Sequence, residues 1–227
     1  MRWMLLACVT VVALIVALQC WYAAHLWWWR DHSPASTAFM DASLERLRTN
    51  RPDARLKHAW VDYERISVHL KRAIIIAEDA KFSEHEGFDF EAIQKALEKN
   101  QKRGKVVAGG STISQQLAKN LFLSGDRTRL RKVQEAAITV MLEKILDKER
   151  ILEIYLNVIE WGDGVFGAEA AARHYYNKSA AQLTAPEAAR LAAMVPRPRF
   201  YERNRATPFL NRKTAWILAQ LPMAELP

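Results

Sequence analysis

The stretch "AIIIAEDAKFSEHEGFDF", residues 73–90, joins an apolar run directly to a cluster of charged side chains. The apolar run has the composition of a buried helix end. A solvated turn has no need of Phe82 or His85, and a buried turn should not carry this much charge without partners. We therefore interpret Glu78 and Asp79 as candidate site residues at the edge of the apolar interior.

Outward from this stretch the sequence pattern is mostly helical. No sustained alternation of apolar and polar residues argues for an extensive sheet. Helix start signals such as Asp89, Ser111 and Thr184 precede the periodic segments. The expected helices cover residues 67–80, 89–103, 112–122, 128–146, 148–157, 165–176, 185–194 and 208–220. The sequence predicts an all-α fold, with residues 45–227 as one domain.

The N-terminal segment has the properties of a membrane anchor. Residues 3–29 contain no Asp, Glu, Lys or Arg. As a helix this run is about 40 Å long, enough to cross a hydrocarbon core of about 30 Å. Tryptophans lie at both ends, as in an aromatic belt, and the run is too long for a cleaved signal peptide. We expect residues 1–30 to be a transmembrane anchor and 31–44 a polar linker.

Charge and cysteine content narrow the choice of partners. A net charge of +8 suits nucleic acid, an acidic membrane or a phosphate-bearing substrate. A single N-terminal span before a long hydrophilic remainder favours a cytoplasmic N-terminus and an exported domain, so nucleic acid is not an expected partner. Cys8 and Cys20 both lie in the anchor, which leaves no disulfide framework or thiolate metal site in the domain.

Two further segments each allow two interpretations. The segment "QKRGKVVAGG", residues 101–110, is by composition a mobile loop, and a loop that closes over a substrate is the alternative. In "GGSTISQQLAKN", residues 109–120, two glycines lead into a helix whose free N–H groups could bind a phosphate oxygen. A plain helix cap explains the same residues, and the spacing is not that of a Walker loop.

The expected helix at 128–146 has an apolar face and a narrow polar arc opposite to it. The apolar face contains Leu130, Val133, Ala137, Val140, Met141 and Ile145. The polar arc contains Lys132, Glu135, Thr139 and Glu143. Periodicity alone favours an ordinary solvated face for this arc over a functional site.

Five blocks in this chain resemble the peptidoglycan glycosyltransferases, the family-51 glycosyltransferase domain of class A penicillin-binding proteins. The blocks are "EDAKFSEHEGFD", "GGSTISQQLAKNLFL", "RKVQEAAITVMLEK", "KERILEIYLNVIEWGDGVFGAEAAARHYY" and "LTAPEAARLAAMVPRPRFY". The resemblance covers roughly residues 45–220, and no Ser-x-x-Lys transpeptidase signature follows. The chain is therefore similar to the monofunctional, membrane-anchored members.

The resemblance implies a fold and two catalytic carboxylates. The fold is a lysozyme-like helical lobe and a smaller, membrane-associated lobe, here built by the residues between "EDAKF" and "GGSTIS". Glu78 matches the general base, and Glu135 matches the second essential carboxylate. Many members read "EDR" where this chain has Ala80 and then Lys81. Lys81 could supply a cation from the next position, without the same contact.

The resemblance also implies a reaction and its substrates. The enzyme joins lipid II to a growing glycan strand with inversion at the anomeric carbon, and polyprenyl pyrophosphate leaves. Cations and amides are needed for the pyrophosphate. The expected substrate-binding residues are Asp79, Lys81, Phe82, His85, Ser111, Thr112, Gln115, Gln116, Lys119, Asn120, Arg127 and Lys132. No dedicated metal cage is expected, although Mg²⁺ or another divalent cation could bridge the pyrophosphate.

Expected partners are lipid II, the glycan strand, membrane lipids of the inner membrane, and cell-wall synthesis or division proteins. Two rival functions are a lysozyme-like peptidoglycan hydrolase and a non-catalytic, membrane-tethered cell-wall-binding protein. A hydrolase uses water as acceptor and needs no cationic pyrophosphate site, which argues against it. Glu143 lies roughly 12 Å from Glu135 by helix rise, so we expect Glu135 alone to serve the pyrophosphate site.

Overall fold

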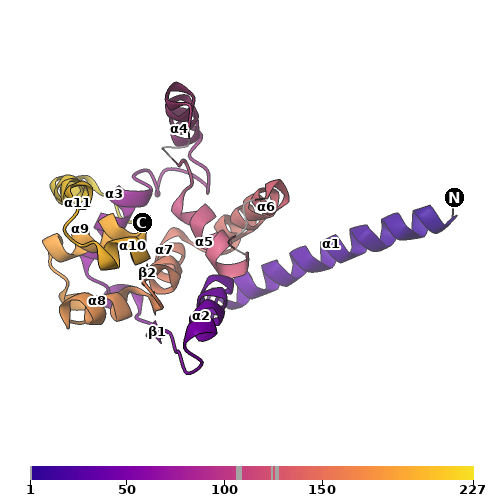
Figure 1. Ribbon diagram of the computed structural model, residues 1–227. Helices are drawn as coiled ribbons and strands as arrows, with labels where there is room; N and C mark the ends of the chain where they lie inside the picture. The colour runs from indigo at the N-terminus through magenta and orange to yellow at the C-terminus, as the bar shows by residue number, and fades with distance from the viewer. Residues whose placement is uncertain (1, 106–108, 124, 126–127) are drawn as a thin grey trace.

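The structure is a computed structural model that describes residues 2–105, 109–123, 125 and 128–227. Its helices are α1 (Arg2–Trp28), α2 (Ala38–Asn50), α3 (Val68–Glu78), α4 (Phe90–Arg103), α5 (Ile113–Phe122), α6 (Arg129–Ile145), α7 (Lys148–Val158), α8 (Ala168–Tyr176), α9 (Ala185–Met194), α10 (Pro198–Arg203) and α11 (Pro208–Gln220). The predicted all-α, lysozyme-like class with one N-terminal apolar helix is confirmed (Figure 1).

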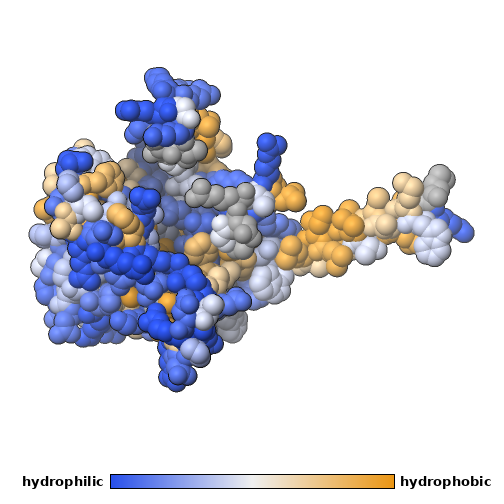
Figure 2. All heavy atoms as spheres, viewed as in Figure 1, coloured by the Kyte–Doolittle hydropathy of each residue, from blue (hydrophilic) through white to orange (hydrophobic). Residues whose placement is uncertain are grey.

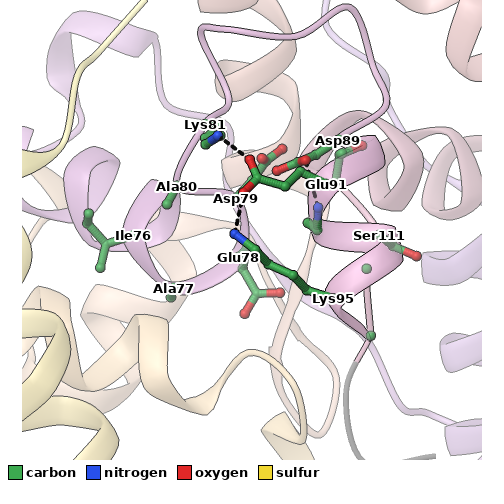
Figure 3. A pocket seen from close by; sticks show the side chains of 14 residues that line it. Ile76, Ala77, Glu78, Asp79, Ala80, Lys81, Asp89, Glu91, Lys95 and Ser111 are labelled. Carbon is green, nitrogen blue, oxygen red and sulfur yellow. Dashed lines mark hydrogen bonds and ion pairs between the residues drawn. The ribbon is translucent and has the colours of Figure 1, made fainter. Parts of the chain in front are cut away.

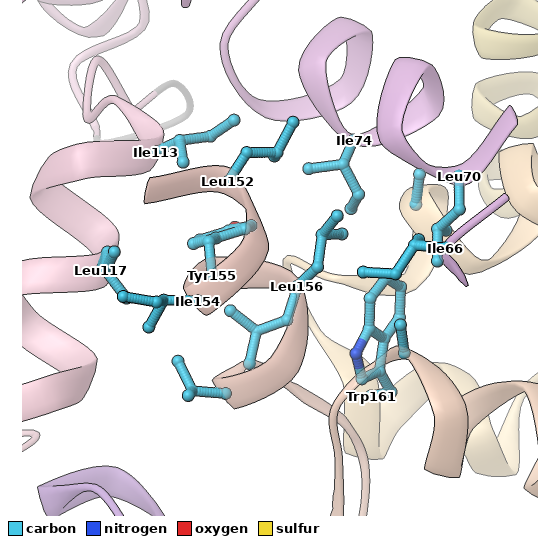
Figure 4. Packing of buried hydrophobic residues seen from close by; sticks show 14 of the residues in the cluster. Ile66, Leu70, Ile74, Ile113, Leu117, Leu152, Ile154, Tyr155, Leu156 and Trp161 are labelled. Carbon is cyan, nitrogen blue, oxygen red and sulfur yellow. The ribbon is translucent and has the colours of Figure 1, made fainter. Parts of the chain in front are cut away.

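The larger lobe is built around the buried helix α7. Every residue of α7 from Ile151 to Val158 is buried. Side chains of α5 and α3 lie on either side of it, and Trp161 closes the cluster at one end (Figure 4). Helices α9 and α11 pack against each other and against α3. This packing fixes the C-terminal end of α3, where the candidate site residues begin.

Three short strands form a small sheet that the sequence does not predict. The strands are β1 (Lys57–His58), β2 (Glu160–Gly162) and β3 (Val165–Phe166). β3 pairs in parallel with β1 and antiparallel with β2. Strands of two or three residues are too short for a period of two to show in the sequence. Because β3 occupies residues 165–166, α8 starts three residues later than expected. Separately, α2 begins inside the expected linker.

The smaller lobe consists of α4 and the segments that connect it to the body. Figure 1 shows α4 standing apart from the other helices. The helix begins at the side-chain cap of Asp89 and ends at Gly104, whose φ of 62° is the left-handed conformation that glycine adopts most readily. The first three residues of the expected loop 101–110 belong to α4, and residues 106–108 lie outside the described residues.

Helix α1 projects from the body as a long apolar rod (Figures 1 and 2). Among the described residues it is the one helix that is long and apolar enough to cross a membrane. Its first seventeen residues, 2–18, are exposed, whereas Tyr22 and Leu26 are buried against the body. The structure therefore supports a membrane anchor whose C-terminal third is part of the folded domain.

The docked end of α1 is held by polar and aromatic contacts. The amides of Gln19 and Gln134 bond each other reciprocally, at 3.4 and 3.3 Å. The ring of Tyr22 meets that of Phe122 edge to face, with centroids 4.9 Å apart. Beyond the helix, Arg150 donates hydrogen bonds of 2.9 and 2.6 Å to the carbonyls of Trp29 and His32. The C-terminal end of the anchor is therefore attached to the domain by direct contacts.

Because α1 contacts the domain at this junction, the stability of a truncated protein should depend on where α1 is cut. Deletion of residues 1–18 keeps the docked third of α1, whereas deletion of 1–32 exposes the surface that Tyr22 and Leu26 cover. Burial of one such side chain contributes about 1.5–3 kcal/mol. Thermal unfolding in detergent should show the shorter deletion near the full-length midpoint and the longer one at least about 5 °C lower. Equal midpoints for the two deletions would contradict the docking.

Candidate active site

Glu78 is the last residue of α3, and its side chain lies in a nearly closed environment. The carboxylate accepts a hydrogen bond of 3.0 Å from Gln116 Nε2 and lies 3.7 Å from Lys213 Nζ. Its side chain is 11% exposed. Burial raises the pKa of Glu78, while Lys213, Gln116 and Lys119 act in the opposite direction. A carboxylate with a raised pKa is a stronger base than one in water.

Gln116 is oriented by a buried tyrosine. Tyr155 on α7 donates a hydrogen bond of 3.0 Å to Gln116 Oε1. Because this bond takes the amide oxygen, the NH₂ group of Gln116 turns toward Glu78. Tyr155 is fully buried, and burial raises its pKa well above the usual value, so the phenol stays a proton donor. The core of the larger lobe therefore determines how Glu78 is solvated.

Asp79, the neighbour of Glu78, points into the protein. Its buried carboxylate accepts hydrogen bonds of 2.9 Å from the Ile113 N–H and from His85 Nε2. Thr112 begins α5 with a capping box and donates 2.7 Å to the Gly87 carbonyl. These contacts join the "EDAKF" loop to the start of α5. The expected roles of Asp79, His85 and Thr112 in substrate binding stay predictions, and their contacts here are internal.

Glu135 lies on the inward side of α6 between two cations. Arg131 Nη1 lies 2.7 Å from one carboxylate oxygen, and Lys132 Nζ bonds the other. In the polar arc of α6, Glu135 and Thr139 are buried and Lys132 is half-exposed, whereas Leu130 and Val133 on the apolar face are 84% and 68% exposed. The expectation of a solvated polar face is wrong for Glu135 and Thr139. Leu130 and Val133 therefore lie on the outside of α6, whereas Met141 and Ile145 of the same face pack against the core. The anchor helix α1 also packs against α6.

A cavity of about 290 Å³ opens beside Glu135, and we call it the cation cavity. Its lining is Phe39, Ser111, Gln115, Gln116, Lys119, Gly125, Arg131, Lys132 and Glu135. Burial lowers the pKa of Lys119, and Glu135 opposes this shift. Three cations thus meet in a partly closed space with one carboxylate. An arrangement with excess positive charge and amide donors suits a multiply charged anion.

A second cavity, of about 280 Å³, lies on the α4 side of Glu78. Figure 3 shows the Glu91 carboxylate between Lys81 and Lys95, while the Glu78 carboxylate points away from them. Lys81 Nζ lies 2.7 Å from Glu91 and is exposed. Lys81 therefore lines this cavity as one half of a surface ion pair, rather than as a free cation.

Glu143 lies deeper on the same arc of α6 and outside these cavities. It accepts a hydrogen bond of 2.5 Å from Ser114 and pairs with Lys148 Nζ at 2.9 Å. Gly87 passes directly over the arc, because a Cβ there would lie 2.8 Å from the Thr139 methyl group. Glu143 therefore holds the "EDAKF" loop, α5 and α7 together.

The remaining expected residues divide by position. Ser111, Gln115, Gln116, Lys119 and Lys132 all line the cation cavity. Phe82 and Asn120 are buried and line neither cavity, and Arg127 lies outside the described residues. Lys213 is not among the site residues expected from the sequence. Lys213 lies three residues after Leu210 and four before Ile217, so helical periodicity places it on the buried face of α11. A buried cation needs a partner, and this was the signal that could have identified it.

The carboxylates of the site are not arranged as metal ligands. Both oxygens of Glu135 are engaged by cations, and Glu78 faces an amide and an ammonium. Within the described part of the chain no group of three His, Cys, Asp or Glu could hold a metal ion. A divalent cation would have to be held mainly by oxygens of a bound pyrophosphate.

Comparisons with known proteins show which sequences this chain is similar to. The family model described as "Transglycosylase" matches residues 44–222. The chain is 62% identical over 216 residues to the biosynthetic peptidoglycan transglycosylase of Methylobacillus flagellatus, covering 95% of this chain and 94% of the relative. It is 61% identical over 226 residues to the protein of the same name from Dechloromonas aromatica, covering 100% and 98%.

The contacts of Glu143 predict a structural cost for its replacement. Glu143→Gln removes the charge opposite Lys148 in a buried setting and should lower the free energy of unfolding by about 1–3 kcal/mol. Glu86→Gln is the matched control, because Glu86 also pairs with a lysine but is exposed. Denaturant unfolding should show a loss for Glu143→Gln and no measurable change for the control. A stable Glu143 variant would contradict the structural role.

Proposed function

Since this chain belongs to the transglycosylase family, we propose that it polymerises lipid II into β-1,4-linked glycan strands with release of polyprenyl pyrophosphate. Membership makes it a peptidoglycan glycosyltransferase. The observation that carries the assignment of residues is the position of Gln116, which bonds Glu78 and also lines the cation cavity. The proposed base, Glu78, and the cation cavity therefore both adjoin the side chain of Gln116.

Glu78 is proposed as the general base. The 4-hydroxyl of the acceptor sugar gives its proton to Glu78 as its oxygen forms a bond to the anomeric carbon of the donor. The bond from that carbon to the pyrophosphate breaks, and an α-linked donor gives a β-linked product. A positioned base contributes roughly 10²–10⁴-fold to such a step. Burial supports this role, because it raises the pKa of Glu78.

The cation cavity is proposed as the site of the departing pyrophosphate. Charge grows on this group as its bond to carbon breaks, and fixed cations stabilise that charge most effectively in a partly closed site. Lys119, Arg131 and Lys132 are the donors. Glu135 orients two of them through direct ion pairs, so its role is to position the cations. Any Mg²⁺ would join as a partner of the pyrophosphate oxygens.

Membrane placement follows from the anchor and the substrate. Lipid II carries a polyprenyl chain, so its pyrophosphate lies at the membrane surface, and helix α6 lines the cation cavity and packs against α1. We propose a single-pass inner-membrane protein with a cytoplasmic N-terminus and an extracytoplasmic catalytic domain. Cell-wall synthesis and division proteins are proposed as its partners in the cell.

The rival functions are less well supported. A hydrolase of the lysozyme type shares a glutamate in a helical lobe but activates water and has no multiply charged leaving group. A binding protein would not require a desolvated carboxylate beside an anion site. The family match and the similar relatives also favour polymerisation.

Replacement of Glu78 tests the proposed base directly. Glu78→Gln keeps the shape of the side chain but cannot accept a proton. Polymerisation of lipid II in detergent should fall by roughly 10²–10⁴-fold, with lipid II binding largely retained. Activity within about tenfold of the wild type would remove Glu78 from the role of general base.

Substitutions on α6 separate the roles of its two carboxylates, Glu135 and Glu143. Glu135→Gln should be nearly inactive, because Arg131 and Lys132 lose the group that orients them. Glu143→Gln should keep substantial activity once its folded fraction is measured. Lys132→Ala should likewise reduce turnover more than Lys144→Ala. An active Glu135 variant beside an inactive but folded Glu143 variant would show that the assignment is reversed.

The pH dependence of activity tests the contact between Lys213 and Glu78. Only deprotonated Glu78 is a base, so activity should fall as the pH drops through its pKa. The ammonium of Lys213 lowers that pKa, hence Lys213→Ala should move the acidic limb of kcat/KM to higher pH, and Lys213→Arg should restore it. An acidic limb that stays in place in Lys213→Ala, measured on lipid II, would separate Lys213 from Glu78.

A further inference from the structure

A third cavity opens on the C-terminal side of the larger lobe, and we call it the aromatic cavity. Its volume is about 500 Å³, and it lies between the end of α9, α10 and the start of α11. The lining is Pro196, Arg197, Phe200, Tyr201, Thr207, Phe209 and Lys213. A volume in this range suits a ligand larger than a single small ion.

The side chains that line this cavity have the chemistry to contact a sugar. Phe200 and Phe209 are 44% and 57% exposed, an unusual cost for two large apolar rings so close together. The guanidinium carbon of Arg197 lies over the Phe200 ring, 5.3 Å from its centroid and within the limit of about 6 Å for a cation–π contact. Exposed ring faces pack on the apolar C–H faces of pyranose rings, and a guanidinium donates to hydroxyl and acetamide oxygens.

One residue connects this cavity to the base. Lys213 lines the aromatic cavity, and its Nζ lies 3.7 Å from Glu78 Oε1. On the other side, Gln116 bonds Glu78 and lines the cation cavity. The contacts therefore define an order: cation cavity, Gln116, Glu78, Lys213, aromatic cavity. A substrate whose pyrophosphate lies in the cation cavity has its anomeric carbon near the middle of this row.

The direction of the row identifies which part of the substrate extends to the aromatic cavity. Figure 1 shows α10 and α11 on the side of the body away from α1, and hence away from the proposed membrane surface. The acceptor is lipid II, and both of its sugars lie between the reacting 4-hydroxyl and the polyprenyl chain. The acceptor sugars therefore extend back toward the membrane. The donor strand extends from its anomeric carbon in the opposite sense and carries no lipid at its far end.

We propose that the aromatic cavity binds N-acetylated amino sugars of the growing glycan strand and retains the strand between successive additions. This inference rests on the proposed function. After each addition the strand must move by one disaccharide without leaving the enzyme. Stacking on a ring face requires no fixed hydrogen-bond pattern, so it allows the strand to slide while it slows dissociation.

The test measures strand length separately from turnover. Phe200→Ala/Phe209→Ala is expected to consume lipid II at an initial rate within about twofold of the wild type. Its glycan strands should be about fivefold shorter, because each lost aromatic contact speeds release by a factor of a few. Phe200→Tyr/Phe209→Tyr should restore the length. Trp216→Ala is the matched control, since Trp216 is an exposed aromatic residue of α11 outside the cavity lining.

Each outcome has a separate meaning. Full-length strands from the folded double alanine variant would overturn the proposal. So would a variant whose only change is in its dependence on polyprenyl chain length, because that result would place lipid in the cavity. A second readout is binding of chitotetraose, a lipid-free N-acetylglucosamine tetramer, which should weaken in the double variant and stay unchanged in Trp216→Ala. If the wild type forms no strands from lipid II, the proposed function itself fails.

Discussion

The burial of carboxylates where α3, α5 and α6 meet is the constraint on which the rest of the structure depends. An unpaired carboxylate withdrawn from water is so costly that each must have partners nearby. Asp79 meets the start of α5, Glu143 meets Ser114 and Lys148, and Glu135 meets two cations of its own helix. Glu78 is the member with the weakest compensation, and burial therefore raises its pKa. The charges that hold the fold together also leave one carboxylate, that of the proposed base Glu78, with a raised pKa.

The same constraint explains the orientation of α6. With Glu135 and Thr139 directed inward, the helix must present Leu130 and Val133 on the outside. That arrangement would be unfavourable in water, but α6 is also the helix that packs against the anchor. The reciprocal amide hydrogen bonds between Gln19 and Gln134 join α1 to α6. Gln134 is the residue directly before Glu135. Membrane attachment and the cation cavity are therefore linked through a single helix rather than through a flexible tether.

Sequence patterns predict most of the helices because capping residues and apolar periodicity are local signals. Asp89 and Thr184 mark their helices within a residue. The small sheet and α2 escape prediction, since very short strands and a polar helix give weak periodic signals. Hydrophobic periodicity finds two faces on α6 but assumes that the apolar one is buried, so it assigns Glu135 to solvent. Lys213 is brought to Glu78 by the packing of α11 on α3, a long-range contact that no local pattern contains.

The central claim is that burial leaves Glu78 with a raised pKa in the folded enzyme. The most direct measurement is a pH titration of the ¹³C signal of its side-chain carboxyl carbon in the full chain in detergent, assigned by its loss in Glu78→Gln. The account predicts a pKa above the ordinary value of 4.5. A titration at or below 4.5 would show that Lys213 and Gln116 outweigh desolvation, and would contradict the proposed basis for a strengthened general base.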